Sequence, residues 1–143
     1  MLSKFSAFYS KNWTIPCEVH LNDLLNVGKT YTIEKNVTKN ITTNRTNIPG
    51  NDILSTPGMI ETMDLHVCNI VNNVLKKECA SVVSKIKCYH KAPLKIGEKF
   101  IITAKVEQVN ENNAVFHVVC NNMDKVVIGD AHITVNAIGI KSK

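Results

Sequence analysis

STPGMIETMDLHVCNIVNNVLKK, residues 55–77, has the clearest helical pattern of this 143-residue chain. Thr56 can cap a helix through its hydroxyl, Pro57 suits the first helical position, and the Lys76-Lys77 pair complements the dipole at the helix C-terminus. Apolar side chains recur at three- and four-residue steps and form one wide apolar face, which contains Ile60, Met63, Val67, Ile70, Val71 and Val74. The pattern predicts a helix over residues 57–76.

Strand patterns lie on both sides of this helix. Residues 30–37 alternate apolar and polar side chains, whereas residues 38–52 are polar, contain Pro49-Gly50 and are predicted to form a loop. After the helix, four β-branched segments predict strands over 80–90, 98–108, 113–122 and 125–137. The last two connections are short enough for hairpins, so we expect an antiparallel meander. This α+β order predicts a hot-dog fold, in which a five-stranded antiparallel sheet wraps around one long central helix.

The length and composition are those of one ordinary globular domain. A chain of this size can bury a single core, and no apolar run approaches the roughly 20 residues that span a bilayer. We assign residues 25–143 to the hot-dog domain and residues 1–24 to an N-terminal arm. The first 13 residues are basic and amphipathic, which also suits an organelle-targeting presequence; we favour a helix or arm packed on the body.

Charge and cysteine usage restrict the partners and the compartment. The net charge is +5, but the lysines are scattered and Arg45 is the only arginine, so we expect no nucleic-acid partner and no membrane partner. Five cysteines are an odd number and include no C-x-x-C pair. This pattern favours free thiols in a reducing compartment over a disulfide framework or zinc site, and it predicts a cytoplasmic protein.

Asp64 is the most informative polar residue of the predicted helix. It lies in register with the apolar positions Ile60, Val67 and Val71, so its carboxylate points toward the apolar side of the helix. Burying an unpaired carboxylate costs several kcal/mol, which favours a functional reason for its presence. The alternative is a structural acid at the edge of the apolar face that reaches water or caps a loop.

Thr56 and His90 are the other candidates for chemistry. Thr56 has an ordinary role as a helix cap, but its hydroxyl also lies beside free N–H groups that can stabilise an oxyanion. It is separated from Asp64 by eight residues, a rise of about 12 Å along a helix. His90 ends a predicted strand, where a surface position is the alternative. We expect His66 to face solvent.

The sequence gives no indication of a metal or another cofactor. His117 and His132 lie within strands, and no two histidines have metal-ligand spacing along the chain. Phosphate-binding loops and nucleophile-elbow motifs are likewise missing from the sequence. We therefore expect a protein that works without a cofactor.

Four short motifs make residues 25–137 resemble the hot-dog thioesterase superfamily, and most closely its fluoroacetyl-CoA thioesterase-like branch. The family's helix-opening segment T-P/G-x-M-x-x-x-x-E corresponds to residues 56–64, and its H-x-A-P/A motif to His90-Lys91-Ala92-Pro93. The family turn P-x-G is represented by residues 94–97, and the last-strand pattern I-G-x-G-x-H-x-R by residues 128–134. Two departures are Asp64 in place of a glutamate and Thr134 in place of the final arginine.

The resemblance implies an acyl-CoA or related acyl-thioester hydrolase with Thr56, Asp64 and His90 as its catalytic residues. It also implies a homodimer or higher homo-oligomer with sites at the subunit interface. The expected substrate-binding residues are Pro57, Gly58, Met59, Lys91 and Lys95, the two lysines serving the nucleotide phosphates. The main alternative is a hot-dog protein that binds an acyl-CoA or another apolar ligand without cleaving it. A hydratase is a further alternative, but the D-x-N-x-x-H signature of hydratases does not occur.

Overall fold

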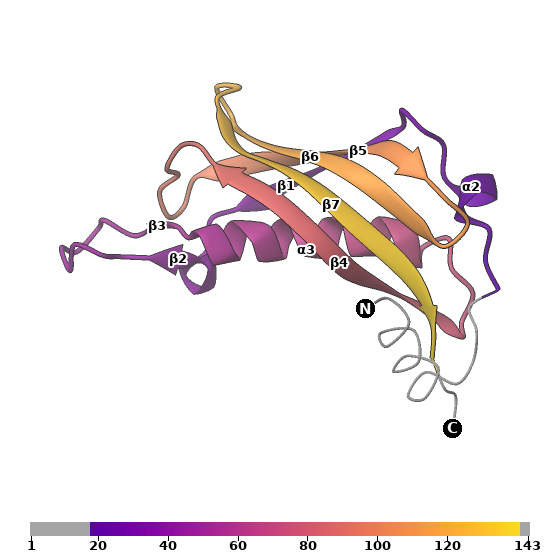
Figure 1. The fold of residues 1–143 in the computed structure, drawn as a ribbon. Coiled ribbons are helices and arrows are strands. Elements are labelled where there is room, and N and C mark those ends of the chain that lie inside the picture. The colour runs from indigo at the N-terminus through magenta and orange to yellow at the C-terminus, as the bar shows by residue number, and fades with distance from the viewer. Residues whose placement is uncertain (1–17, 141–143) are drawn as a thin grey trace.

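The structure, a computed structural model, describes residues 18–140. Within this range, a curved antiparallel sheet and one long helix, α3 (Thr56–Asn72), make up most of the fold (Figure 1). The sheet contains β1 (Thr30–Asn36), β4 (Cys79–His90), β5 (Lys99–Val109), β6 (Asn113–Asn122) and β7 (Val127–Gly139). The shorter elements are α2 (Leu21–Leu24), the 3₁₀ helix η1 (Lys39–Ile41), β2 (Thr42–Thr43) and β3 (Ile53–Leu54).

The strand order in the sheet is β1-β5-β6-β7-β4, and every neighbouring pair is antiparallel. The expected meander is confirmed as β5-β6-β7. Within the described chain, β1 and β4 are the two edge strands, and β4 follows α3 directly in sequence. The predicted hot-dog arrangement of a five-stranded sheet around one long helix is therefore confirmed.

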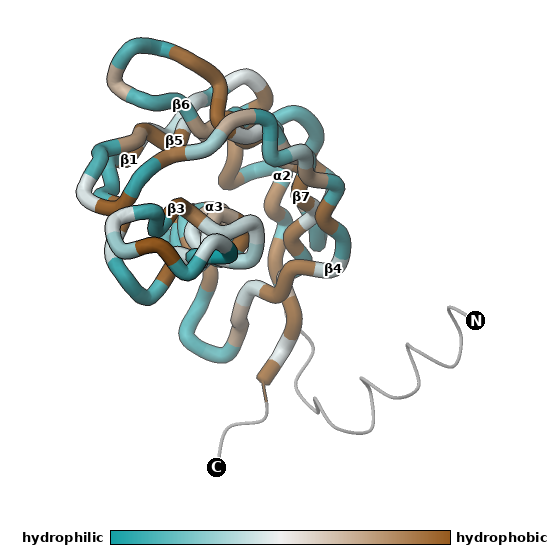
Figure 2. The backbone as a smooth tube through the Cα atoms, turned by 90° about the vertical axis from the view of Figure 1, so that its left-hand side faces the viewer, coloured by the Kyte–Doolittle hydropathy of each residue, from teal (hydrophilic) through white to brown (hydrophobic). Residues whose placement is uncertain are grey.

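The sheet curves around α3 and buries it from one side. Viewed along the helix, the backbone arches from β1 on one flank of α3, over β5 and β6, to β7 and β4 on the other flank (Figure 2). Helix residues such as Met59, Met63 and Val67 are buried against Phe100, Phe116 and other inward-facing strand residues. This apolar contact supplies the main driving force for the fold, since burying one large side chain contributes roughly 1.5–3 kcal/mol.

The helix begins one residue earlier and ends four residues earlier than predicted. Ser55, rather than Thr56, is the N-cap, and its Oγ accepts a hydrogen bond from the Gly58 N–H at 3.0 Å. At the other end, the Asn72 side chain accepts a hydrogen bond from the Ser81 N–H at 3.0 Å. The backbone then continues in turns, so that Lys76-Lys77 lies beyond the helix.

Two glycines allow the start of α3 to approach its neighbours closely. A Cβ at Gly58 would lie 2.6 Å from the Ile41 carbonyl oxygen, and a Cβ at Gly129 would lie 2.4 Å from the Met59 sulfur. Gly129 is also the register partner of His90 on β4. The absence of these two side chains thus brings the helix N-terminus close to the end of β4.

The structure describes only residues 18–24 of the predicted N-terminal arm. Residues 1–17, which include the predicted helix or arm over 1–13, lie outside the described residues. The described part of the predicted arm contains α2, whose Leu21 is buried. None of the described helices has the length and apolarity needed to cross a bilayer.

The expectation that all five cysteines are free thiols is wrong at Cys79. This cysteine is disulfide-bonded, whereas Cys68, Cys88 and Cys120 are free. Sequence spacing could not indicate a bridge of this kind, because it depends on which segments the fold brings together.

Candidate active site

Thr56 and His90 meet at the N-terminus of α3. Thr56 is the first helical residue, and His90 is the last residue of β4. Their side chains form a hydrogen bond of 2.8 Å between Thr56 Oγ1 and His90 Nδ1. Because Ser55 caps the helix, the Thr56 hydroxyl is free to make this contact.

The other ring nitrogen of His90 is buried without a partner. Nε2 is inaccessible to solvent and has no hydrogen bond within the described chain. A buried polar atom without a partner costs about 1–3 kcal/mol, so such atoms are uncommon in folded proteins. The imidazole thus uses one nitrogen for Thr56 and keeps the other available inside the protein.

Asp64 lies two helical turns beyond Thr56 and is half-buried. Residues 56, 60, 64 and 68 form one row of four-residue steps along α3. Cys68 in this row donates its thiol hydrogen to the Asp64 carboxylate at 3.2 Å, and the Ser81 hydroxyl on β4 donates to the Cys68 carbonyl at 3.3 Å. The Thr56–His90 and Ser81–Cys68 bonds tie β4 to both ends of the row, so Asp64 lies along the β4 side of the helix.

The β4 side of α3 is less completely covered than the rest of the core. We call it the β4 flank, defined by the half-buried residues Ile60 and Asp64 on the helix and Ile86, Cys88 and His90 on β4. The β4 residues share the concave face of the sheet, because they pair with the buried residues Ile133, Ala131 and Gly129 of β7. The flank therefore combines one carboxylate and one imidazole with apolar surface at a sheet edge.

Cys68 is a hydrogen-bond donor to Asp64 and is a poor nucleophile. Burial, together with Asp64 as a smaller cause, raises the pKa of the Cys68 thiol to about 11. A thiol with this pKa is protonated at neutral pH, whereas nucleophilic attack requires the thiolate. The contact between Cys68 and Asp64 was not predicted from the sequence, although their four-residue spacing was a usable signal.

The first turn of α3 retains few free backbone donors. The Gly58 N–H is taken by Ser55 Oγ, the Met59 N–H by the Ser55 carbonyl, and Pro57 has no N–H. The Thr56 N–H is the remaining donor of this turn. An oxyanion at the helix N-terminus would therefore meet one backbone donor beside the Thr56 hydroxyl, and not the several donors that the sequence suggested.

The five expected substrate-binding residues fall into two groups. Gly58 and Met59 are buried, and Met59 packs against Gly129 in the core. Pro57, Lys91 and Lys95 are exposed. Lys91 and Lys95 lie in the loop that follows β4. A hydrogen bond from the Leu54 N–H to the Leu94 carbonyl joins this loop to the segment that precedes α3.

The expectation that His66 faces solvent is wrong. His66 is only 6% exposed, and its Nε2 donates to the Tyr31 carbonyl of β1 at 3.0 Å. The sheet covers both flanks of α3, so a position opposite Asp64 meets β1 instead of water. A cavity of about 390 Å³ also lies on this β1 side; it is lined by residues such as Ile33 and His66, and by none of the three predicted catalytic residues.

Comparison with solved structures identifies the same fold in several thioesterase-like proteins. A hot-dog-like protein from Thermanaerovibrio acidaminovorans aligns with a TM-score of 0.74 and 20% identity, covering 83% of this chain and 87% of that protein. A fluoroacetyl-CoA thioesterase aligns with a TM-score of 0.72 and 18% identity, covering 81% and 90%. A thioesterase superfamily member from Thermus thermophilus gives 0.69 and 19%, covering 80% and 84%. No curated protein matches the chain.

A family model provides stronger evidence than these distant structural likenesses. The model described as "fluoroacetyl-CoA-specific thioesterase" matches residues 37–137, which is more than half of the chain and includes α3 and β4 to β7 apart from the last two residues of β7. The matched range contains the helix N-terminus, Asp64 and His90. The chain therefore belongs to the fluoroacetyl-CoA-specific thioesterase family.

Proposed function

We propose that this protein hydrolyses an acyl-CoA or a related acyl thioester, with Thr56, Asp64 and His90 as its catalytic residues. The hydrogen bond between Thr56 and His90 is the observation that carries the proposal. It joins a helix N-terminus to an imidazole whose second nitrogen is buried and unpaired. A purely structural histidine at a strand end would have no need of this arrangement.

The three residues have different roles in the proposed reaction. Asp64 either attacks the thioester carbonyl or removes a proton from the attacking water. The Thr56 N–H and hydroxyl stabilise the carbonyl oxygen as negative charge develops on it. His90 either polarises the Thr56 hydroxyl through Nδ1 or protonates the departing thiolate. Fluorinated substrates are not part of the proposal.

The substrate class is supported by the relatives and by the charge around the helix N-terminus. A structure of the related fluoroacetyl-CoA thioesterase has been solved with fluoroacetate and CoA, and another with acetyl-CoA. In this chain, exposed Lys91 and Lys95 lie in the loop after β4, where they can meet phosphate groups. The apolar β4 flank provides surface for an acyl group.

We further propose that the active form is a homodimer in which a second copy covers the β4 flank. β4 is an edge strand, and its concave face carries half-buried apolar side chains such as Ile86. Unpaired edges with apolar surface are commonly protected by another chain. A second copy at this edge would also enclose Asp64 and supply a partner for His90 Nε2.

Turnover of a panel of acyl-CoAs, followed by trapping of the released thiol, tests the proposed function. We expect wild-type turnover on at least one member and a loss of about 10²- to 10⁴-fold in kcat/KM for Asp64→Asn and His90→Gln. Asp124→Asn and His20→Gln change exposed residues and serve as matched controls. Full activity in both site variants would contradict the assignment. Acyl-CoA binding without thiol release would favour the alternative, a binding protein.

A single turnover in ¹⁸O-labelled water distinguishes the two roles of Asp64. If Asp64 is the nucleophile, its carboxylate forms a mixed anhydride with the acyl group and the thiol leaves. Water that attacks the Asp64 carbonyl of this anhydride then puts the label into Asp64 and an unlabelled oxygen into the acid product. If Asp64 is the general base, the label enters the product directly. Mass spectrometry of the product and of the peptide that contains Asp64 separates these outcomes.

A further inference from the structure

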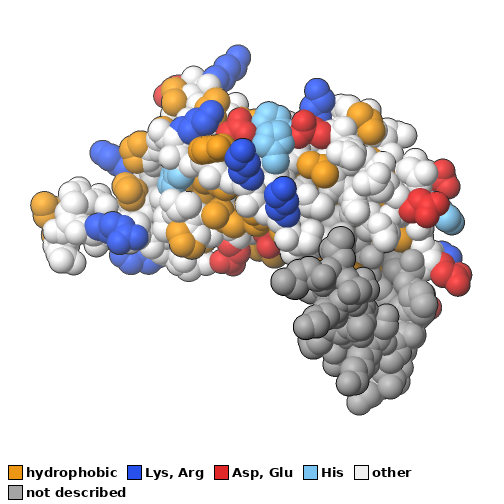
Figure 3. Space-filling model, viewed as in Figure 1, with side chains coloured by type: hydrophobic (Ala, Val, Ile, Leu, Met, Phe, Trp, Pro, Cys, Tyr) orange, Lys and Arg blue, Asp and Glu red, His pale blue; other side chains and the backbone are white. Residues whose placement is uncertain are grey.

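The outer face of the sheet, which is turned away from α3, carries a cluster of two histidines and two carboxylates. His117 on β6 and His132 on β7 are direct register partners, and their rings stack with centroids 4.6 Å apart. Asp130 lies two residues before His132, on the same face of β7, and its Oδ1 lies 2.9 Å from His117 Nε2. Figure 3 shows histidine bordered by acidic and lysine side chains on the face turned to the viewer.

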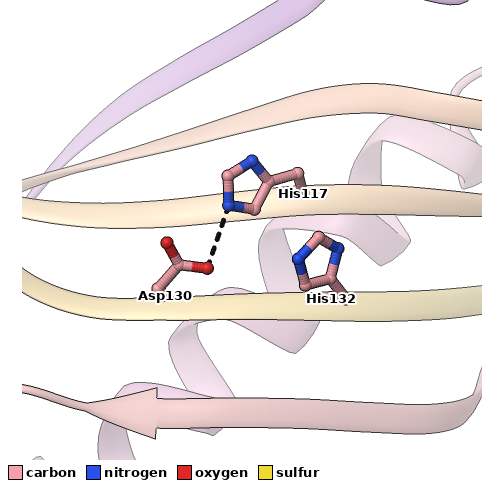
Figure 4. A group of neighbouring side chains, drawn as sticks. All are labelled: His117, Asp130 and His132. Atoms are coloured by element: carbon pink, nitrogen blue, oxygen red, sulfur yellow. Dashed lines mark hydrogen bonds and ion pairs between the residues drawn. The ribbon is translucent and has the colours of Figure 1, made fainter.

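The three residues bring metal-ligating atoms together. One ligand atom from each of His117, Asp130 and His132 can be chosen so that all three lie within 4.8 Å of one another. In a tetrahedral zinc site with bonds of 2.0–2.2 Å, neighbouring ligand atoms are roughly 3.3 Å apart. In Figure 4, one ring nitrogen of His132 faces the His117–Asp130 pair, and the other faces away from it. Small side-chain rotations would therefore complete a binding geometry.

Glu107 holds His132 in the orientation that ligation requires. Its carboxylate accepts a hydrogen bond from His132 Nδ1 at 2.7 Å, so Nε2 is the ring nitrogen that is available to a ligand. Metal-binding histidines usually donate their other N–H to a carboxylate in this way.

Glu107 reaches His132 from a distant strand. It belongs to β5, whereas His132 belongs to β7, two strand spacings or roughly 9.5 Å away. The register of β5 with β6 shifts between Val106 and Gln108, so Glu107 is the extra residue of a β-bulge. Bulges redirect side chains and often lie beside functional sites. The bulge thus explains how Glu107 reaches His132.

We propose that His117, Asp130 and His132 bind a divalent transition-metal ion, with Zn²⁺ as the expected ion. The ligand atoms are Nε2 of both histidines and a carboxylate oxygen of Asp130, and water completes the tetrahedron. The ion takes the place of the hydrogen between His117 Nε2 and Asp130, and the neutral imidazole then carries its proton on Nδ1. Two imidazoles with one carboxylate are a ligand set that suits zinc.

Two features oppose binding and set the limits of the affinity. The rings of His117 and His132 are nearly parallel, with an interplanar angle of 7°, so both must tilt toward the ion. Lys105 and Lys87 flank the histidine pair in the same cross-strand row, and their positive charges repel a cation. The carboxylates of Asp130 and Glu107 offset these two charges.

Residue spacing along the chain could not indicate this cluster, because strand pairing creates it. His117 and His132 are 15 positions apart, which matches no metal-ligand spacing along a chain. The ion would join β6 and β7 from outside the sheet, on the face opposite Thr56 and His90. The site is thus separate from the proposed thioesterase chemistry, and each can fail without the other.

Titration of the full, tag-free chain with Zn²⁺ by calorimetry, and with Co²⁺ by visible absorption, tests the proposal. We expect one ion per chain at micromolar metal, a tetrahedral Co²⁺ spectrum, and thermal unfolding that shifts upward with Zn²⁺. Glu107→Gln should weaken binding about tenfold, because it removes only the support of His132. His132→Gln and Asp130→Asn should weaken it more, and His20→Gln, at an exposed histidine outside the cluster, should leave it unchanged.

Each alternative outcome overturns the proposal. These are the absence of saturable binding, unchanged affinity in His132→Gln or Asp130→Asn, and an equal loss in His20→Gln. A sulfur-to-cobalt charge-transfer band would assign the ion to cysteine and would also overturn it. Because His132 and Glu107 are solvent-accessible, their variants should fold even if His117→Gln does not.

Discussion

The Thr56 hydroxyl shows how one residue can combine a structural position with a chemical role. Sequence reasoning assigned it two functions, helix cap and candidate catalytic group, and the structure divides these between neighbours. Ser55 takes the capping bond, and Thr56 takes the bond to His90. A single-residue shift of the cap therefore frees the hydroxyl that the proposed reaction uses.

Replacing Thr56 separates its hydroxyl from its shape. Thr56→Val keeps the branched side chain but loses the bond to His90, so we expect kcat to fall about 10²-fold on a substrate that the wild type hydrolyses. Thr56→Ser restores the hydroxyl and should retain most of the activity. Steady-state kinetics and urea denaturation of both variants check this. Equal activity of the two variants would contradict a role for the hydroxyl.

Cys68 predicts a specific alkaline dependence of stability. Its folded pKa of about 11 exceeds the ordinary thiol value of 9.0, so between these pH values the unfolded chain releases a proton that the folded chain keeps. The associated stability is complete below about pH 9 and is lost as the pH rises through 11. The urea midpoint should therefore fall less between about pH 8 and pH 10.5 in Cys68→Ala than in wild type. Cys88 and Cys120 are retained in both proteins and cancel in the comparison.

At the level of elements, the position of α3 depends on close backbone contacts at its N-terminus. Ser55 bonds to both the helix and the preceding segment, since its Oγ contacts the Gly58 N–H and the Ile41 carbonyl. Gly58 packs directly on Ile41, with no space for a side chain. These contacts hold the end of the helix beside β4.

Gly58→Ala should destabilise the protein, although alanine is the better helix former. Helix propensity alone would favour the change by up to about 1 kcal/mol. The added Cβ would meet backbone and side-chain atoms of Ile41 at 2.6–2.9 Å, so we expect a net loss of about 1–3 kcal/mol. Asn69→Ala, at an exposed position of the same helix, is the control and should be neutral or stabilising. A higher urea midpoint for Gly58→Ala would contradict the close contact.

For the whole molecule, the amino-acid pattern predicted the architecture better than the site. Helix and strand periodicity report local burial, so the elements from β4 to β7 agree with the predicted ranges to within two residues. The predicted end of the helix was wrong because the actual end depends on the contact between Asn72 and β4. The predicted exposure of His66 was wrong because β1 covers the second flank of the helix. The Thr56–His90 pair was predicted as a shared site through family motifs, and its 2.8 Å contact required the fold.

The assembly of the protein is the corresponding prediction at this scale. We expect light scattering to give twice the chain mass of 15.9 kDa, because a second copy covers the β4 flank. Ile86→Lys places a charge in that flank and should produce a monomer with lower activity. Ile33→Lys makes the same change at a half-buried isoleucine on the other edge strand, β1, and should leave the dimer intact. A monomeric wild type, or dissociation only in Ile33→Lys, would contradict the proposed interface.

The contact between Gly129 and Met59 has a consequence for how this sequence can change. Any side chain at position 129 would overlap the Met59 thioether, so the side chains at positions 129 and 59 must fit into the same space. Evolutionary drift should therefore couple them, with a larger residue at 129 accompanied by a smaller one at 59. A designer who enlarges only one partner would displace the helix terminus from the imidazole beside it.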